Sequence, residues 1–121
     1  MQHIGIDIIE IPRIERAVRH WGSRFLRRVF TRREVNLCHD NCASLAARFA
    51  GKEAVMKALN TPLPVLSFRD IEILSDSSGR PVVHLHGPVK KLTAEMGISG
   101  IDVSLSHSRD NAVAMAITNL K

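Results

Sequence analysis

Residues 43–60 read ASLAARFAGKEAVMKALN, and the rest of the chain is best understood as packing around this stretch. Its large apolar residues recur at helical spacing, which predicts one long helix with a buried stripe made of Leu45, Phe49, Met56 and Leu59. Gly51 interrupts this helix at a cost of about 1 kcal/mol relative to alanine. We therefore expect another backbone or a ligand to pass close to Gly51.

The segment before this helix alternates between strand and helix signals. Residues 3–11 predict a strand that is apolar on both alternating faces, apart from Asp7 and Glu10, and so is buried on both sides. Pro12 is well placed to begin a helix, and residues 13–28 form one basic helix or two short ones broken near Gly22. A further short helix is expected to begin with a capping box formed by Thr31 and Glu34.

The segment after the helix predicts two hairpins and one more helix. Pro62 and Pro64 are expected to end the long helix. Strands are expected over 68–75 and 81–86, a helix from Pro88 to Met96 ended by Gly97, and a final hairpin over 101–107 and 112–118. The expected fold is α+β, with a mostly antiparallel sheet packed on one long helix plus short helices, in a single domain over 1–121.

Composition excludes several classes of protein. The chain has 121 residues, 45% of them hydrophobic and only 4% aromatic, so a globular fold with an aliphatic core is expected. No apolar run has the length of a membrane span, and no basic segment precedes the first hydrophobic residues. We therefore expect a cytoplasmic protein with no membrane partner.

The formal net charge is +5, and much of the excess lies in one short stretch containing Arg13, Arg16, Arg19, Arg24, Arg27, Arg28, Arg32 and Arg33. Such a cluster favours an acidic partner: nucleic acid, an anionic membrane or an acidic protein. A nucleic-acid-binding module is the rival hypothesis from a different class. The predicted strands lack the aromatic platforms of single-strand binders, and no helix-turn-helix or zinc-finger pattern occurs.

Cys38, His39 and Cys42 form the only group of soft metal-ligand residues. Three loosely spaced candidates without a fourth give weak support for a metal site. The simpler interpretation is a pair of reduced thiols near a helix start.

Asp7, Glu53 and Lys57 carry the clearest signal of chemistry. Asp7 lies in an apolar strand, where a carboxylate costs free energy unless a cation or hydrogen bonds compensate it. Glu53 lies beside the buried stripe of the long helix, and Lys57 shares that edge. Each residue alone has an ordinary structural interpretation. Together, two acids on separate apolar elements with a lysine nearby suit Mg²⁺, and therefore phosphate chemistry.

Two further segments are candidates for ligand contacts. The turn at 77–81 offers backbone amides and the Arg80 guanidinium to a phosphate, although a plain hairpin turn is the simpler interpretation. Residues 104–107, SLSH, form a strand that ends in a histidine. A serine hydrolase is poorly supported because no acid lies at the spacing of a catalytic triad.

Five segments, in order and covering nearly the whole chain, resemble the motifs of holo-acyl-carrier-protein synthases: GIDIIEI at 5–11, FTRRE at 30–34, ARFAGKEAVMKAL at 47–59, GRP at 79–81 and SLSH at 104–107. The motif at 47–59 is the specific one. The departure is Gly51, where the family usually has alanine. The resemblance identifies the chain as a member of a family that transfers 4′-phosphopantetheine from coenzyme A to a serine of apo acyl carrier protein.

The resemblance also implies roles for residues. Asp7 and Glu53 would hold Mg²⁺ against the pyrophosphate of coenzyme A, and Lys57 would offset charge on the transferring phosphate or the leaving group. The coenzyme A site would be lined by Arg48, Gly79, Arg80, Pro81, Ser106 and His107. The general base stays open between Glu53 and a water held by Asp7 or the metal.

Partners follow from the same resemblance. The products would be holo acyl carrier protein and adenosine 3′,5′-bisphosphate, in support of fatty acid biosynthesis, and carrier domains of polyketide or peptide synthases remain alternative acceptors. Family members of this length are homotrimers whose active sites are shared between neighbours. Acyl carrier proteins are acidic, so the basic helix after the first strand is the expected docking surface, with Arg13, Arg16, Arg24 and Arg28 as the contacts.

Overall fold

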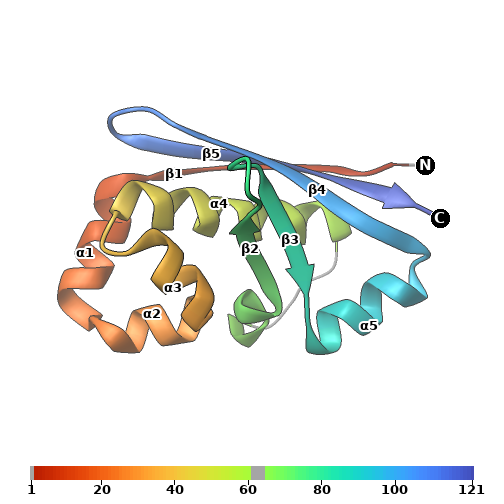
Figure 1. Cartoon of the computed structure of the whole chain (residues 1–121), viewed down its shortest axis with the longest axis horizontal. Coiled ribbons are helices and arrows are strands. Elements are labelled where there is room, and N and C mark those ends of the chain that lie inside the picture. Colours follow the sequence, from red (N-terminus) through yellow and green to blue (C-terminus); the bar gives the residue numbers. More distant parts are fainter. Residues whose placement is uncertain (1, 61–64) are drawn as a thin grey trace.

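A computed structural model describes residues 2–60 and 65–121 (Figure 1). Along the chain the elements are β1 (Ile4–Glu10), α1 (Ile11–Trp21), α2 (Ser23–Val29), α3 (Arg32–Cys38), α4 (Cys42–Leu59), the 3-10 helix η1 (Val65–Asp70), β2 (Ile71–Ser75), β3 (Pro81–Leu85), α5 (Gly87–Glu95), β4 (Ile98–His107) and β5 (Asn111–Leu120). The fold is α+β, as the sequence predicts.

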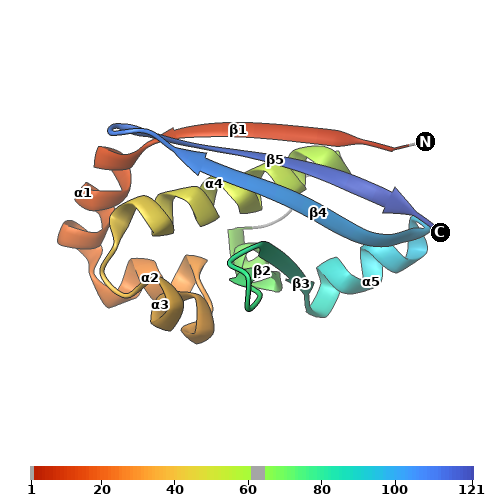
Figure 2. The ribbon, with the colours of Figure 1, turned by 45° about the horizontal axis from the view of Figure 1, so that its top comes forward.

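The strands form two antiparallel sheets rather than the one that the sequence suggests. The larger sheet has the order β1-β5-β4, and β2 and β3 form a separate two-stranded sheet. Figure 2 shows α4 running beneath the three strands of the larger sheet. The small sheet packs against α4 through β2 and against the larger sheet through the contact of β3 with β4, and α4 supplies much of the core.

Strand β1 is buried on one face only, which corrects the prediction of a strand buried on both sides. Gly5 and Ile9 face α4, whereas Ile4, Ile6 and Ile8 are between 60% and 66% exposed. The alternation follows from the pleat of a strand whose second face is uncovered within this chain. An apolar row of this kind requires a further explanation.

The basic segment after β1 forms two helices, which confirms the second of the two alternatives. The break lies at Gly22, whose φ of 56° is a left-handed conformation that favours glycine. The predicted capping box at the start of α3 is also present, because Thr31 Oγ1 accepts a hydrogen bond from the Glu34 amide while Glu34 Oε1 accepts one from the Thr31 amide.

Helix α4 is the predicted long helix, with 18 residues. Asn41 caps its start by accepting a hydrogen bond from the Ser44 amide, and Asn60 ends it in a left-handed conformation. Its burial is broader than a stripe: small residues are buried around most of the helix, while Phe49 and Met56 are only half-buried. The expected helix breakers Pro62 and Pro64 lie outside the described residues.

Two glycines let other elements approach α4, and the sequence pointed to only one of them. A Cβ at Gly51 would lie 2.6 Å from Ile73 Cδ1 and 3.1 Å from Leu105 Cδ2, so side chains come close there rather than another backbone. The close approach of two backbones occurs at Gly5, where a Cβ would lie 1.9 Å from the Ala54 carbonyl oxygen. Gly5 therefore sets the distance between β1 and α4.

The remaining elements follow the prediction with shifted ends. Residues 68–70 belong to η1 rather than to the first strand of the small sheet. Helix α5 ends before Gly97, which has a φ of 75°, and the final hairpin is longer than expected, with strands β4 and β5 of ten residues each. In the part of the chain that the structure describes, no helix has the length and apolar character needed to span a bilayer.

Candidate active site

The predicted carboxylates meet where β1 crosses α4. Asp7 lies on β1 with its side chain only 17% exposed, and Lys57 Nζ on α4 donates hydrogen bonds of 3.0 Å to Asp7 Oδ1 and to the Ile6 carbonyl oxygen. The sequence places Lys57 on the helix edge that it shares with Glu53, where a Glu-to-Lys pair is the ordinary interpretation. The structure instead gives the lysine to Asp7, because the close contact at Gly5 brings β1 onto this side of α4.

Glu53 completes the group from α4. Burial raises the pKa of its carboxyl, the charge of Asp7 raises it further, and Lys57 partly offsets both effects. A carboxylate whose ionisation is opposed by burial and by a neighbouring carboxylate suits a divalent cation. Among residues 2–60 and 65–121, no three His, Cys, Asp or Glu side chains gather as a complete metal cage.

A pocket of about 200 Å³ gathers five of the six residues expected at the coenzyme A site. Its walls come from α4, the turn between β2 and β3, and the end of β4; they include Arg48, Gly79, Pro81, Ser106 and His107. The sixth, Arg80, lines an adjoining open hollow that shares Gly79, Pro81 and Leu105 with the pocket. The structure therefore brings together residues that lie far apart in the sequence.

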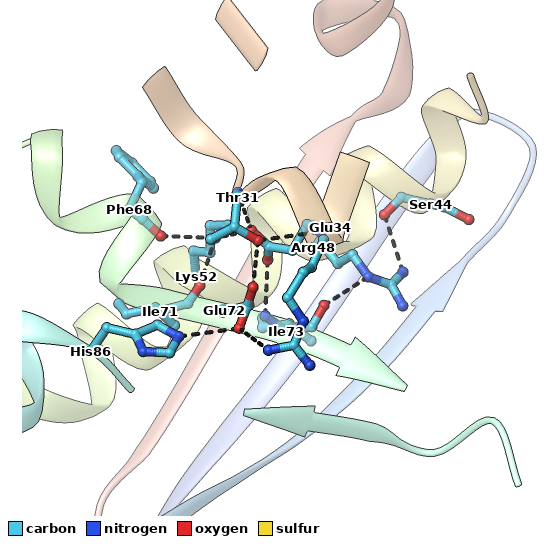
Figure 3. A network of polar contacts seen from close by, with 11 residues as sticks. Thr31, Glu34, Ser44, Arg48, Lys52, Phe68, Ile71, Glu72, Ile73 and His86 are labelled. Atoms are coloured by element: carbon cyan, nitrogen blue, oxygen red, sulfur yellow. Dashed lines mark hydrogen bonds and ion pairs between the residues drawn. The ribbon is translucent and has the colours of Figure 1, made fainter. Parts of the chain in front are cut away.

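Arg48 is largely committed to holding the small sheet. Its Nε donates to the Ile73 carbonyl oxygen at 3.1 Å (Figure 3). Its Nη2 donates to Ser75 Oγ at 3.1 Å. Nη1 makes a long contact of 3.5 Å to the Ser44 carbonyl oxygen. Arg48 thus reaches the pocket as part of its wall, with two of its three nitrogens already bonded to β2.

Fewer backbone amides of the turn at 77–81 are available to bind a ligand than the sequence suggested. Asp76 Oδ1 accepts the amides of Ser78 and Arg80, and the Gly79 amide donates to the Asp76 carbonyl oxygen. Hydrogen bonds from Ser78 and from the Arg80 amide lower the pKa of Asp76, so the carboxylate holds the turn in one shape. The turn therefore presents the Arg80 guanidinium to a ligand rather than these amides.

The four arginines expected to dock a partner are all exposed, Arg13 and Arg16 on α1 and Arg24 and Arg28 on α2. Trp21, which no sequence pattern marked as functional, is 53% exposed beside them. The Arg24 guanidinium lies 5.9 Å from the centre of its ring, and the two line a hollow with Phe25, Arg27 and Arg28. A lone tryptophan within an arginine-rich stretch was the signal that could have identified it.

A second group that sequence reasoning missed lies where α3 and α4 meet β2. Glu34 and Lys52 are fully buried and form an ion pair of 2.8 Å, and Glu72 is buried nearby (Figure 3). All buried side-chain nitrogen and oxygen atoms in the described ranges have hydrogen-bond partners. The capping box revealed the position of Glu34 but not its burial.

Comparisons with known proteins agree with this geometry. Residues 3–117 match the sequence pattern of the 4′-phosphopantetheinyl transferase superfamily. A holo-[acyl-carrier-protein] synthase of Dehalococcoides mccartyi is 50% identical over 117 residues, which cover 97% of this chain and 98% of that protein.

Solved structures give the same result. The holo-[acyl-carrier-protein] synthase of Helicobacter pylori in complex with coenzyme A superimposes with a TM-score of 0.85 at 33% identity, covering 96% of this chain and 99% of that one. A holo-(acyl-carrier-protein) synthase from Bacillus anthracis in complex with coenzyme A (3′,5′-ADP) gives 0.79 at 32% identity, covering 98% and 96%. The chain therefore belongs to the 4′-phosphopantetheinyl transferase superfamily, among relatives that are holo-[acyl-carrier-protein] synthases.

Proposed function

We propose that this enzyme transfers 4′-phosphopantetheine from coenzyme A to a serine of apo acyl carrier protein and releases adenosine 3′,5′-bisphosphate. The observation that carries the proposal is the placement of Glu53 and Lys57, with Asp7 against them, on the same helix that lines the pocket with Arg48. Relatives of the same fold include complexes with coenzyme A and with 3′,5′-ADP. Fatty acid biosynthesis in the cytoplasm, carried out by a single domain over 1–121, is the proposed context.

Mg²⁺ would be held by Asp7 and Glu53, and it would neutralise charge on the pyrophosphate of coenzyme A. The donor set fits because the two acids share one site and the burial of Glu53 opposes its ionisation in the absence of a cation. Lys57 already donates to Asp7 and to the Ile6 carbonyl oxygen, and its third N–H group is left for a phosphate oxygen.

The chain's own residues would bind and orient the two reactants. Arg80 and His107 line the hollow and the pocket and would contact the nucleotide portion of coenzyme A. The serine oxygen of the carrier protein attacks the β-phosphorus, and the bond from that phosphorus to the bridging oxygen breaks. The electron pair leaves with 3′,5′-ADP, and the serine proton passes to Glu53 or to a water held by Asp7.

Two proposals concern partners. The acidic carrier protein would dock on Arg13, Arg16, Arg24 and Arg28, because these exposed arginines lie on the two helices that directly follow β1. The enzyme would be a homotrimer with active sites shared between neighbours, because β1 carries an exposed apolar row. Neither surface is needed to explain the fold of the single chain.

The decisive experiment is mass spectrometry of apo acyl carrier protein after incubation with the enzyme, coenzyme A and Mg²⁺. We expect the carrier to gain the mass of one phosphopantetheine, and an unchanged carrier mass would contradict the proposal. Apo carrier domains of polyketide and peptide synthases, assayed in parallel, test the alternative acceptors. Thermal stabilisation by coenzyme A with Mg²⁺, and not by an oligonucleotide, separates the enzyme from a nucleic-acid-binding module.

A further inference from the structure

Lys52 and Arg48, both on α4, donate hydrogen bonds to backbone carbonyl oxygens of the same strand, β2. Lys52 Nζ donates to the Ile71 carbonyl oxygen at 2.5 Å, and Arg48 Nε donates to the Ile73 carbonyl oxygen at 3.1 Å. Residues four apart on a helix are separated by about 6 Å along its axis. Residues two apart on a strand are separated by about 6.6 Å. The spacing on the helix is close to the spacing on the strand. Lys52 and Arg48 can therefore bind the carbonyl oxygens of Ile71 and Ile73, which lie two residues apart on β2.

Glu34, on α3, bonds to both Lys52 and β2. We call the hydrogen bonds of Glu34, Lys52 and Arg48 with β2 the junction. Glu34 Oε1 accepts from Lys52 Nζ at 2.8 Å and its Oε2 accepts from the Ile73 amide at 2.9 Å. Lys52 Nζ also donates to the Phe68 carbonyl oxygen at 2.8 Å, so its three protons are all used. The pair thereby ties α3, α4, η1 and β2 together at one buried point (Figure 3).

The junction joins two elements that carry parts of the proposed active site, α4 and β2. On α4, Lys52 is the direct neighbour of Glu53, whose carboxyl lies within electrostatic reach of Asp7. Strand β2 leads directly into the turn that carries Gly79 and Pro81 to the pocket. A shift of β2 along α4 would therefore change the distance between the carboxylates and the pocket.

A buried ion pair is a costly way to gain stability alone. Desolvation of two charges offsets most of their attraction, and apolar residues of similar volume often stabilise a core as well or better. A lysine with three fixed acceptors instead defines one position and one register, which apolar packing does less sharply. This favours a positional role for the pair over a purely stabilising one.

We propose that the Glu34–Lys52 pair is a positioning element for the reaction, which fixes the register of β2 on α4 and so aligns the coenzyme A pocket with the carboxylates Asp7 and Glu53. This inference rests on the proposed function. Neither residue touches a substrate; both act through the strand and the helix that they join. A misplacement on the order of 1 Å is enough to cost about 100-fold in rate.

The test is Lys52→Met, which keeps the volume of the stem and removes the three donated hydrogen bonds. In the folded fraction we expect KM for coenzyme A to rise at least about tenfold and kcat to fall, because a misaligned pocket affects both. The affinity for apo carrier protein, measured without coenzyme A, should change less than about twofold, since α1 and α2 keep their arginines.

Two controls separate positioning from stability. Val89→Ala truncates a fully buried residue of α5 that donates and accepts none of the hydrogen bonds of the junction, so it should lower the melting temperature while both KM values stay unchanged. Lys91→Met removes an exposed lysine charge and should change neither quantity. Equal KM values for Lys52→Met and wild type, or equal rises for both substrates, would overturn the proposal.

If Lys52→Met does not fold, Glu34→Gln answers the same question. Its side-chain oxygen still accepts one amide of the junction, while the charged partner of Lys52 is gone, so the same rise in KM for coenzyme A is expected. Isothermal titration of coenzyme A against this variant gives a second readout, with at least about tenfold weaker binding expected. Wild-type binding would overturn the proposal. A wild-type enzyme that does not transfer phosphopantetheine at all would instead refute the proposed function.

Discussion

At the scale of the residue, the position of Glu53 lowers the stability of the free protein and suits the proposed function. Burial and the neighbouring Asp7 both raise the pKa of its carboxyl. Ionisation of Glu53 therefore costs free energy in the free protein, and the proposed cation between the two acids would offset this cost. Active sites are where such opposed groups are expected.

Removing either acid should abolish transfer. We expect Asp7→Ala and Glu53→Ala to reduce kcat/KM at least about 100-fold, because one remaining carboxylate would hold the divalent cation poorly. Steady-state assays over a range of Mg²⁺ concentrations measure this, and circular dichroism checks the fold. Glu95→Ala, which removes an exposed carboxylate of α5, is the matched control. Wild-type turnover in either active-site variant would reject the metal assignment.

The same pKa predicts that Glu53→Gln stabilises the metal-free protein. Between the ordinary value of 4.5 and the raised pKa, the folded state binds more protons at Glu53 than the unfolded state does. Stability at this site therefore falls as pH rises through that window, and the loss is complete above it. Glutamine carries no charge and escapes the loss.

Thermal unfolding without metal measures this difference. At about pH 7.5 the melting temperature of Glu53→Gln should exceed that of the wild type, and near pH 4 the two should coincide. Coenzyme A with Mg²⁺ should then stabilise the wild type more than the variant, because bound ligand raises the stability of the folded state. A variant that is less stable than the wild type at neutral pH would contradict the pKa direction.

At the scale of the element, the contact of β1 with α4 places Asp7 beside Glu53. This contact depends on Gly5, since a Cβ there would overlap the Ala54 carbonyl oxygen and lie 2.7 Å from the Ala58 amide nitrogen. Both neighbours are backbone atoms of a helix, which cannot move aside as the end of a side chain can. The strand itself would have to retreat.

Gly5→Ala should destabilise the enzyme by about 3 kcal/mol or more, because overpacking against backbone leaves no inexpensive adjustment. Chemical denaturation measures the loss, and the remaining folded protein should bind Mg²⁺ with coenzyme A more weakly than the wild type. Gly100→Ala is the control, since a Cβ added at Gly100 would meet no atom within 4 Å. Equal stabilities of the two variants would show that β1 and α4 can separate freely.

The element scale also shows what a sequence can predict. The capping box at Thr31 and Glu34 and the break at Gly22 follow from local chemistry, and they were predicted correctly. The residues expected at the coenzyme A site came from motifs, and the fold gathers most of them in one pocket. The split into two sheets and the uncovered face of β1 depend on which strands meet in space. Apolar alternation gives no information on strand partners.

The burial of Lys52 was unpredictable for a related reason. Lysine is almost never fully buried unless it is paired, and its partners here come from three elements distant in the sequence. The amides of the turn at 77–81 were misjudged because Asp76, which binds them, lies just outside that segment. Both cases show that side-chain contacts determine details that periodicity alone cannot.

At the scale of the whole molecule, the exposed row on β1 supports the proposed assembly. Ile4, Ile6 and Ile8 lie on one face of the sheet, and Met115 on the neighbouring strand β5 pairs with Ile6. Single exposed apolar residues are ordinary, but a contiguous patch on a sheet marks an interface. A homotrimer would cover it.

Charge placed on this row should separate the subunits. We expect Ile6→Glu with Ile8→Glu to convert the proposed trimer into a monomer and to reduce transfer sharply, because the active sites are proposed to be shared. Sedimentation velocity and the carrier assay measure the two effects on the same sample. Leu37→Glu, at an exposed position on α3, should leave both unchanged. A wild-type protein that is a fully active monomer would refute the assembly.

The arginine surface on α1 and α2, made of Arg13, Arg16, Arg24 and Arg28, is the proposed docking site for the carrier protein. Exposed ion pairs contribute on the order of 1 kcal/mol or less each, so their joint effect should appear as steering and salt sensitivity. Arg13→Glu with Arg24→Glu replaces two attractions by two repulsions on separate helices. The expected result is a rise in KM for the carrier protein of at least about tenfold, which corresponds to about 1.4 kcal/mol.

The same variant should bind coenzyme A almost as the wild type does, because the pocket lies on α4, β4 and the turn of the small sheet. Moderate salt should weaken the carrier affinity of the wild type more than that of the variant, since screening removes an attraction in one and a repulsion in the other. Lys90→Glu with Lys91→Glu on α5 is the matched double reversal and should change carrier affinity little. Weak coenzyme A binding with normal carrier affinity would place these arginines in the nucleotide site instead.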